Sequence, residues 1–163
     1  MTDYQGRTAS APPIEVRNET TIAAPAGPVW DLLTDVGVWP SWYRACRWVR
    51  VERAGDDGRA VWFRWKAHPI ELRSTVLVRE RPHRFVIVAE GLGVRATRTF
   101  TLRPALDGRG TLVISHETQD GWLPWLGRLV LARRLHAANQ AMFADLARAI
   151  GSRGPTRVPS MTR

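Results

Sequence analysis

The sequence predicts an α+β domain in which a curved antiparallel sheet of about seven strands wraps around one long C-terminal helix. Residues 47–117 are rich in Val, Ile, Thr, Trp and Phe, and turn signals recur every ten to sixteen residues. That spacing leaves no room for helices between the strands, so sequential strands are expected to pair antiparallel. After Gly121 the apolar residues take a helical spacing instead.

The composition fits one globular domain without covalent or metal bracing. Of 163 residues, 44% are apolar and 24% are charged, and a chain of this length buries about 70% of its extended surface on folding. Cys46 is the single cysteine, which excludes a disulfide within one chain and predicts a cytoplasmic protein. Neither a secretory signal nor a membrane span is expected.

The charge predicts a moderately basic surface. There are 24 basic and 15 acidic residues, which gives a formal charge of +9, and all the basic residues except Lys66 are scattered arginines. Such a net charge affects solubility and non-specific attraction rather than the fold. Residues 1–13 and 151–163 are small, polar and proline-containing, so both are predicted to be flexible tails, the second one basic. One domain, residues 14–150, lies between them.

The first elements follow from alternation and from the prolines. Residues 15–23 alternate well enough to form a strand. Pro25 and Pro28 end this strand and open a short helix, which Gly37 stops. The run Trp39-Pro40-Ser41-Trp42-Tyr43 predicts a second short helical turn, whose three aromatic residues need an apolar surface.

Five turn signals divide the remaining strands: Asp56-Asp57-Gly58, His68-Pro69, Arg81-Pro82-His83, Gly91-Leu92-Gly93 and Asp107-Gly108. The long helix that follows has an apolar stripe formed by Leu131, Leu135, Ala138, Met142, Leu146 and Ala149. Gly151 is expected to end this helix. Because the helix must cover the apolar face of the sheet, a pocket is expected where the curved sheet stands away from it.

A two-residue turn at Asp107-Gly108 fixes which residues face each other in the last hairpin. It sets Leu102 opposite Val113, Phe100 opposite Ser115, and Arg98 opposite Glu117. This face is mostly apolar, so it is expected to be the inner one, with Arg98 and Glu117 as a charge pair beside the cavity. The alternative is a pair at the rim in water, since Leu112 and Ile114 make the other face apolar as well.

The first hairpin is treated in the same way. A three-residue loop at Asp56-Asp57-Gly58 sets Val51 opposite Phe63 and Val49 opposite Trp65. Phe63 and Trp65 are then core residues or line a cavity, and sequence alone leaves both open. The opposite face is predicted to be surface, with Trp62, Arg64 and Lys66 on it.

The order of these segments resembles a known superfamily. Residues 21–35 and Trp39-Pro40-Ser41-Trp42 resemble the opening of START-like helix-grip (SRPBCC) proteins of the polyketide cyclase/dehydrase type. Later matching segments are Phe63-Arg64-Trp65, Leu72-Arg73-Ser74-Thr75-Val76, Gly110-Thr111, Glu117 and Gly121. The resemblance covers about residues 14–150 and implies a helix-grip fold with a hydrophobic ligand cavity. The superfamily mixes lipid carriers, hormone receptors and aromatase/cyclases, so the fold does not name the function.

The first functional prediction is binding of an apolar or aromatic small molecule between the sheet and the last helix. Trp39 and Trp42 are expected near the mouth of the cavity. The other residues expected to contact a ligand are Phe63, Trp65, Ser74, Arg98, Phe100, Ser115, Glu117, Trp122, Trp125 and Met142.

Two alternatives come from other functional classes. A polyketide aromatase/cyclase or dehydratase would use Arg98 to stabilise an enolate and Glu117 as a base, with His116 as a further candidate. Single-stranded nucleic acid would instead bind Trp62, Arg64 and Lys66, although no RNP signature or concentrated basic stripe supports this.

The segment that joins the last strand to the long helix, residues 121–127, has two interpretations. Trp122 and Trp125 could plug the edge of the sheet, or they could form a mobile gate or lip. Because Arg128, Arg133 and Arg134 follow, such a lip would suit transient contact with an anionic membrane surface.

No metal or cofactor is expected. His68, His83, His116 and Glu117 lack any spacing typical of metal ligands. The sequence also has no P-loop, Rossmann or GxSxG motif. Cys46 is expected to be a quiet, partly buried thiol.

Overall fold

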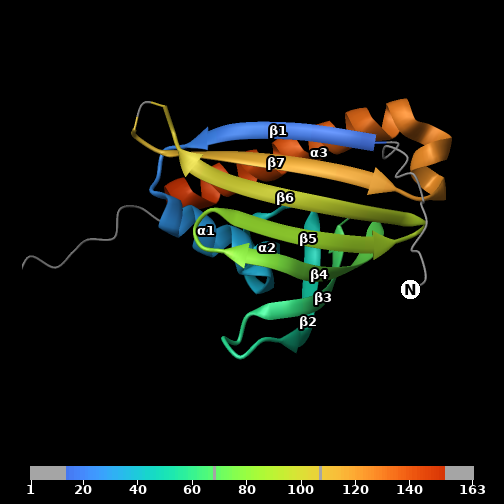
Figure 1. Cartoon of the computed structure of the whole chain (residues 1–163), viewed down its shortest axis with the longest axis horizontal. Helices are drawn as coiled ribbons and strands as arrows, with labels where there is room; N and C mark the ends of the chain where they lie inside the picture. Colours follow the sequence, from blue (N-terminus) through green and yellow to red (C-terminus); the bar gives the residue numbers. More distant parts are fainter. Residues whose placement is uncertain (1–13, 68, 107, 153–163) are drawn as a thin grey trace, which may run out of the picture.

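Seven antiparallel strands form one open sheet in the part of the chain that the structure describes (Figure 1). The computed structural model describes residues 14–67, 69–106 and 108–152, without the side chains of residues 123 and 125–128. The strands are β1 (Ile14–Ile22), β2 (Cys46–Ala54), β3 (Ala60–Ala67), β4 (Ile70–Glu80), β5 (Arg84–Gly91), β6 (Val94–Pro104) and β7 (Thr111–Asp120). The helices are α1 (Ala26–Thr34), the 3-10 helix η1 (Val36–Val38), α2 (Trp39–Trp42) and α3 (Trp122–Ser152).

The strand order is β1-β7-β6-β5-β4-β3-β2. The first strand therefore pairs with the last, and the connection that holds α1, η1 and α2 crosses from one edge of the sheet to the other. In Figure 1 α3 runs behind β1 and β7. This arrangement confirms the predicted α+β class, the two short helices after the first strand and the long C-terminal helix. The predicted tails, residues 1–13 and 151–163, lie outside the described residues except for Gly151 and Ser152, which belong to α3.

The predicted register of the last hairpin is confirmed. Arg98 lies opposite Glu117 and Phe100 opposite Ser115. The connection is wider than a two-residue turn, because the strands stop at Pro104 and resume at Thr111. Asp107 itself lies outside the described residues. The register is unaffected because the wider loop takes the same number of residues from each of the two strands.

The first hairpin also has the predicted pairs, Val51 with Phe63 and Val49 with Trp65. Gly58 adopts a φ of 73°, the left-handed conformation that the three-residue loop requires. Register shifts occur in the β2–β3 pair and again in the β4–β5 pair, between Val76 and Val78. Such bulges bend strands and increase their twist, and in Figure 1 β2 and β3 turn away from the direction of the other strands.

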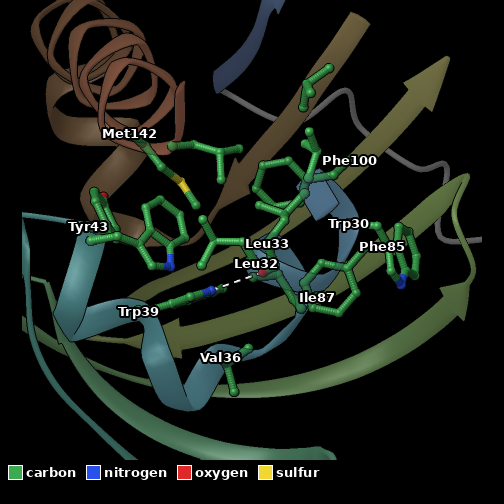
Figure 2. Packing of buried hydrophobic residues seen from close by; sticks show 14 of the residues in the cluster. Trp30, Leu32, Leu33, Val36, Trp39, Tyr43, Phe85, Ile87, Phe100 and Met142 are labelled. Carbon is green, nitrogen blue, oxygen red and sulfur yellow. Dashed lines mark hydrogen bonds between the residues drawn. The ribbon is translucent and has the colours of Figure 1, made fainter. Parts of the chain in front are cut away.

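The core lies between the sheet and the helices, and Figure 2 shows its centre. Phe85 stacks on Phe100 with ring centroids 6.2 Å apart, and Trp30 meets Phe85 edge-on at 6.3 Å. Leu32 and Leu33 of α1 are also fully buried in this cluster. The apolar side of α1 therefore packs on the sheet.

The long helix matches its predicted stripe only in its second half. Met142 and Leu146 are buried, whereas Leu131 and Leu135 are half-buried and Ala138 is exposed. Among the side chains that the structure describes, those of the second half of α3 are therefore the more deeply buried. The helix ends at Ser152, slightly beyond the expected stop at Gly151.

We expect Phe85→Ala to lower the free energy of unfolding by about 3–5 kcal/mol, because it leaves a cavity between Trp30 and Phe100. Urea denaturation followed by circular dichroism measures this change. The matched control is Leu77→Ala on β4, where the side chain is 57% exposed. A loss within about 0.5 kcal/mol is expected there, and equal losses in both variants would contradict this description of the core.

Candidate functional site

A buried ion pair lies between the sheet and α3. Arg98 on β6 and Glu117 on β7 face the inner side of the sheet, with side chains 13% and 4% exposed. Nε of Arg98 donates to Oε2 of Glu117 at 2.6 Å, and Nη2 of Arg98 donates to the same oxygen. Of the two arrangements that the sequence left open, the structure has the inner one and not the rim in water.

Two amides complete this pair. Nη2 of Arg98 donates to Oδ1 of Asn139 on α3, and Nδ2 of Asn139 donates to Oε2 of Glu117 at 3.3 Å. Gln119 donates to Oε1 of Glu117 at 2.9 Å. We call Arg98, Glu117, Gln119 and Asn139 the buried polar cluster. Both oxygens of the carboxylate accept hydrogen bonds within it, so the negative charge is well compensated.

Among the described residues, the partners of Nη1 of Arg98 are soft ones. Nη1 lies 3.4 Å from the thioether sulfur of Met142, which is a weak acceptor. The guanidinium also lies 5.6 Å from the centroid of the Phe100 ring. In Figure 2 the side chain of Met142 points from α3 into the core cluster. A stronger acceptor than sulfur would gain a charge-assisted hydrogen bond from Nη1 if Met142 moved aside.

A second polar spot lies one strand further along. Asn18 on β1 is the register partner of Ser115 on β7, and both residues are buried. Nδ2 of Asn18 bonds to Nδ1 of His136 at 2.9 Å and to its backbone oxygen at 3.3 Å. Oδ1 of Asn18 and Oγ of Ser115 have no hydrogen-bond partner among the described residues. Each such buried atom costs about 1–3 kcal/mol, so this spot favours a bound water or a polar group of a ligand.

An aromatic wall flanks the polar groups. Trp39 lies edge-on to Phe63 and to Trp65, with centroids 5.7 and 5.2 Å apart. Its indole N–H donates to the backbone oxygen of Leu33 at 3.0 Å (Figure 2). The indole of Trp65 donates to Oγ of Ser74 at 2.9 Å. These predicted residues are thus brought together on the inner face.

Trp39 and Trp42 do not lie where the sequence places them. The sequence predicts both near the mouth of a cavity, but both are buried members of the core cluster. The reason is that α2 follows η1 directly, so this short helix packs beneath β2 and β3 instead of standing at the rim. Their contact with a ligand stays a prediction.

Sequence reasoning missed four residues of the site: Asn18, Gln119, Asn139 and Tyr43. Two carried a usable signal. Asn18 occupies an inward position of β1, two residues after Val16, and Asn139 interrupts the apolar side of α3 between Leu135 and Met142. Tyr43 is buried, and this burial raises the pKa of its phenol, while the positive charge of Arg98 opposes the rise.

Three hollows among the described residues lie away from α3. One hollow of about 360 Å³ lies between α1 and the β2–β3 loop, and another of about 270 Å³ lies on the outer face beside Trp62. A third of about 400 Å³ lies beside Trp48. None of these three is lined by α3, and side chains such as Met142 and Trp39 fill the space beneath the helix. None of these three hollows is the cavity expected between the sheet and α3, which stays a prediction.

The junction between β7 and α3 has features of both interpretations of residues 121–127, a plug at the edge of the sheet and an exposed lip. The indole of Trp122 lies against Gly93 of the β5–β6 turn, where a β-carbon would come within 1.9 Å of Nε1 of Trp122. Gly121 adopts a φ of 119°, a conformation that side chains strongly disfavour. Trp122 nevertheless remains 60% exposed. The side chain of Trp125 lies outside the described residues.

Two further candidates lie on the outer face of the sheet, away from this site. Nε2 of His116 bonds to Oε1 of Glu15 at 2.7 Å on the outer face. His116 therefore cannot assist the Arg98–Glu117 pair, contrary to the expectation from the sequence. Trp62 is partly exposed there, and Arg64 is bonded to two glutamates, Glu52 and Glu71. Among the described residues no three His, Cys, Asp or Glu side chains gather as a metal site would require.

A sheet that closes over a C-terminal helix, with short helices after its first strand, is the architecture of START-like helix-grip proteins. The chain belongs to the polyketide cyclase / dehydrase and lipid transport family, whose sequence model matches residues 13–151. No curated protein matches the chain. The match to the family model confirms the resemblance drawn from the sequence. No helix among the described residues is long and apolar enough to span a bilayer, and a cytoplasmic location stays a prediction.

Solved structures share this fold at low sequence identity. A START superfamily protein of Mycobacterium smegmatis is 17% identical over 85% of this chain and 95% of its own, with a TM-score of 0.67. A protein of Thermus thermophilus is 20% identical over 86% of this chain and 99% of its own, with a TM-score of 0.72. DynU16, a protein in the dynemicin biosynthetic locus, is 18% identical over 85% of this chain but only 47% of its own, with a TM-score of 0.65. These likenesses show the fold alone.

We expect Glu117→Gln to lower the free energy of unfolding by about 3–5 kcal/mol, since it leaves the Arg98 charge buried without its partner. The double variant R98M/E117L removes both charges and should recover most of that loss. Urea denaturation of the single and double variants measures both effects. The matched control is Glu90→Gln, which breaks the exposed Arg95–Glu90 pair on β5 and β6 and should cost less than about 1 kcal/mol. Equal losses at the two pairs would contradict a buried pair.

We expect Cys46 to react slowly with iodoacetamide. The thiol is buried, and this burial raises its pKa from an ordinary value of 9.0 to about 11. At about pH 8 the thiolate fraction is then about 100-fold lower than that of an unburied thiol, and alkylation followed by mass spectrometry should be slower by at least that factor. An alkylation rate equal to that of the urea-unfolded chain would contradict the burial.

The same shift predicts how stability depends on pH. The folded state holds the thiol proton more tightly, so this contribution is complete below about pH 9 and is lost as the pH rises toward 11. Cys46→Ala should therefore make the free energy of unfolding fall less steeply over that interval.

Proposed function

We propose that the protein binds an apolar or aromatic small molecule between the inner face of the sheet and α3. The observation that carries this proposal is the set of polar atoms with poor or absent partners inside an otherwise apolar core. Ligand sites of this kind are mostly apolar, with a few directional groups that orient the ligand. Membership in a family described by cyclase, dehydrase and lipid transport functions supports the same class of ligand.

The polar groups suggest how the ligand is oriented. Nη1 of Arg98 can donate to a carbonyl or hydroxyl oxygen in place of the Met142 sulfur. Oγ of Ser115 and Oδ1 of Asn18 can bond to a hydroxyl group. Because Glu117 already balances the charge of Arg98, a neutral oxygen suits this site better than a carboxylate, which would add an uncompensated buried charge.

We propose that α3 moves to admit the ligand, and its two halves make different contacts among the described residues. Oδ2 of the buried Asp145 accepts the backbone N–H of Arg44 at 3.0 Å, which ties the second half to the segment after α2. The first half is held by the bond between Asn18 and His136 and by the contact of Trp122 with Gly93. We therefore place ligand entry at the first half, with Gly121 as the hinge.

Carriage or sensing has better support than catalysis. A general base needs a lone pair that can reach the substrate, but both oxygens of Glu117 accept hydrogen bonds from Arg98, Gln119 and Asn139. A polyketide cyclase or dehydratase activity remains the second candidate, because the family description names it and Arg98 could stabilise an enolate.

Nucleic-acid binding has less support than either. The two glutamates that bond to Arg64 neutralise the most central basic group of the Trp62, Arg64 and Lys66 face. A single exposed indole then remains as a stacking platform on β3, and phosphate binding requires net positive charge beside such a platform.

Titration with the neutral naphthyl ketone Prodan tests the proposed site. We expect saturable binding of one equivalent with a blue shift of its emission, because the probe enters an apolar site and its carbonyl accepts from Arg98. The double variant R98M/E117L should weaken binding about tenfold or more, since it removes a charge-assisted hydrogen bond. The same titration can be followed by protection of α3 amides from hydrogen exchange.

The control variant is R95M/E90L, which replaces the exposed ion pair between β5 and β6 outside the site. Its affinity for Prodan should equal that of the wild type. Absence of saturable binding, or equal weakening by both double variants, would contradict a ligand site beside Arg98.

A further inference from the structure

One end of the molecule exposes four large apolar side chains that no part of the described chain covers. Leu92, Trp122, Leu129 and Val130 are 65%, 60%, 75% and 61% exposed. We call these four residues the apolar tip. Leu92 belongs to the β5–β6 turn and the others to the first half of α3, and the contact of Trp122 with Gly93 holds the two segments together. Figure 1 shows the start of α3 at the same end of the sheet as this turn.

The apolar tip faces away from the core. Trp122 and Leu129 are separated by two helical turns and so lie on one side of α3. The side that carries Asn139, Met142 and Leu146 is the buried one. Between Trp122 and Val130 the described solvent-facing side chains of α3 are thus apolar, where surface helices normally carry polar residues.

The turn that contributes Leu92 has an unusual backbone. Leu92 adopts a φ of 46°, in the left-handed region that glycine or asparagine normally occupies. This conformation costs free energy, and the side chain, which is 65% exposed, recovers little of it by burial within the described chain. A strained apolar residue at an exposed turn points to a surface that gains its packing from outside the chain.

Charge identifies the kind of surface. Arg133 and Arg134 are exposed and follow the apolar tip by one helical turn, with Arg133 on the same side of the helix as Leu129. Asp145 is the single acidic residue of α3, so nothing on the first half of the helix offsets these charges. Tryptophan and leucine next to arginine suit the boundary between acyl chains and anionic headgroups.

We propose that the apolar tip inserts shallowly into an anionic bilayer surface, with Arg133 and Arg134 bound to lipid phosphates. A second copy of the chain fits this surface less well, because a twofold contact through the tip would bring the Arg133 side chains of both copies together. This inference goes beyond small-molecule binding and does not depend on it. It places the bilayer against the first half of α3.

Flotation with vesicles tests the inference in the absence of any small-molecule ligand. We expect the protein to float with phosphatidylcholine vesicles that contain about 30% phosphatidylglycerol, and not with vesicles of phosphatidylcholine alone. The variants L129Q/V130Q and R133Q/R134Q should each reduce the bound fraction about tenfold or more, because each removes one of the two contributions. All four positions are solvent-exposed, so melting temperatures should stay within about 2 °C of the wild type.

Two matched controls separate the apolar tip from the overall charge of +9. R50Q/R53Q removes two exposed arginines of β2, and Leu77→Gln removes an exposed apolar residue of β4. Neither should reduce binding by more than about twofold. Equal losses in R50Q/R53Q and R133Q/R134Q would overturn the proposal in favour of non-specific attraction. Absence of binding to the anionic vesicles, or a concentration-dependent dimer that L129Q/V130Q abolishes, would also overturn it.

Discussion

The buried ion pair between Arg98 and Glu117 is the constraint on which the rest of the domain depends. Removing two charges from water costs several kcal/mol each, and their attraction offsets this cost only if the geometry is good and the remaining hydrogen bonds are made. The pair lies across β6 and β7, so it is compatible with one register only. Asn139 bonds to both members, and this fixes the height at which α3 crosses the sheet. The ring of Phe100 lies 5.6 Å from the guanidinium, and both side chains of the pair are buried from water.

The two halves of α3 make different contacts with the rest of the domain. Its second half is tied to the segment after α2 through Asp145 and to the core through Met142 and Leu146. Among the described side chains of its first half, His136 bonds to Asn18 of β1 and Trp122 lies against Gly93 of a hairpin turn. Local openings in proteins start where few apolar contacts are lost. The buried polar cluster lies at the boundary between the two halves, so any displacement of the first half uncovers the polar groups first.

The sequence was most informative about residues that face each other across a hairpin. Pairing across a hairpin follows from the turn, so the positions of Arg98, Phe63 and Trp65 relative to their partners could be calculated. Which face was inner could not, because Ile114 on the outer face is as apolar as Val113 on the inner one and is also buried. Asn18 and Asn139 escaped prediction because their meeting with other groups depends on how α3 is rotated. Side-chain packing under the helix decides whether a cavity exists, and no pattern in the sequence predicts that packing.

The pairing of β1 with β7 has a consequence for how the chain is made. Ile14 pairs with Gln119, and Ile22 with Thr111, so the first strand has no partner until the last one leaves the ribosome. At about 5–20 residues per second this delay amounts to roughly 5–20 s, during which an unpaired strand edge is exposed to other chains. Every second residue at the start of β1 is charged, namely Glu15, Arg17 and Glu19. Charged side chains on a strand oppose pairing with foreign edges, so this alternation protects the nascent chain while it waits for its native neighbour.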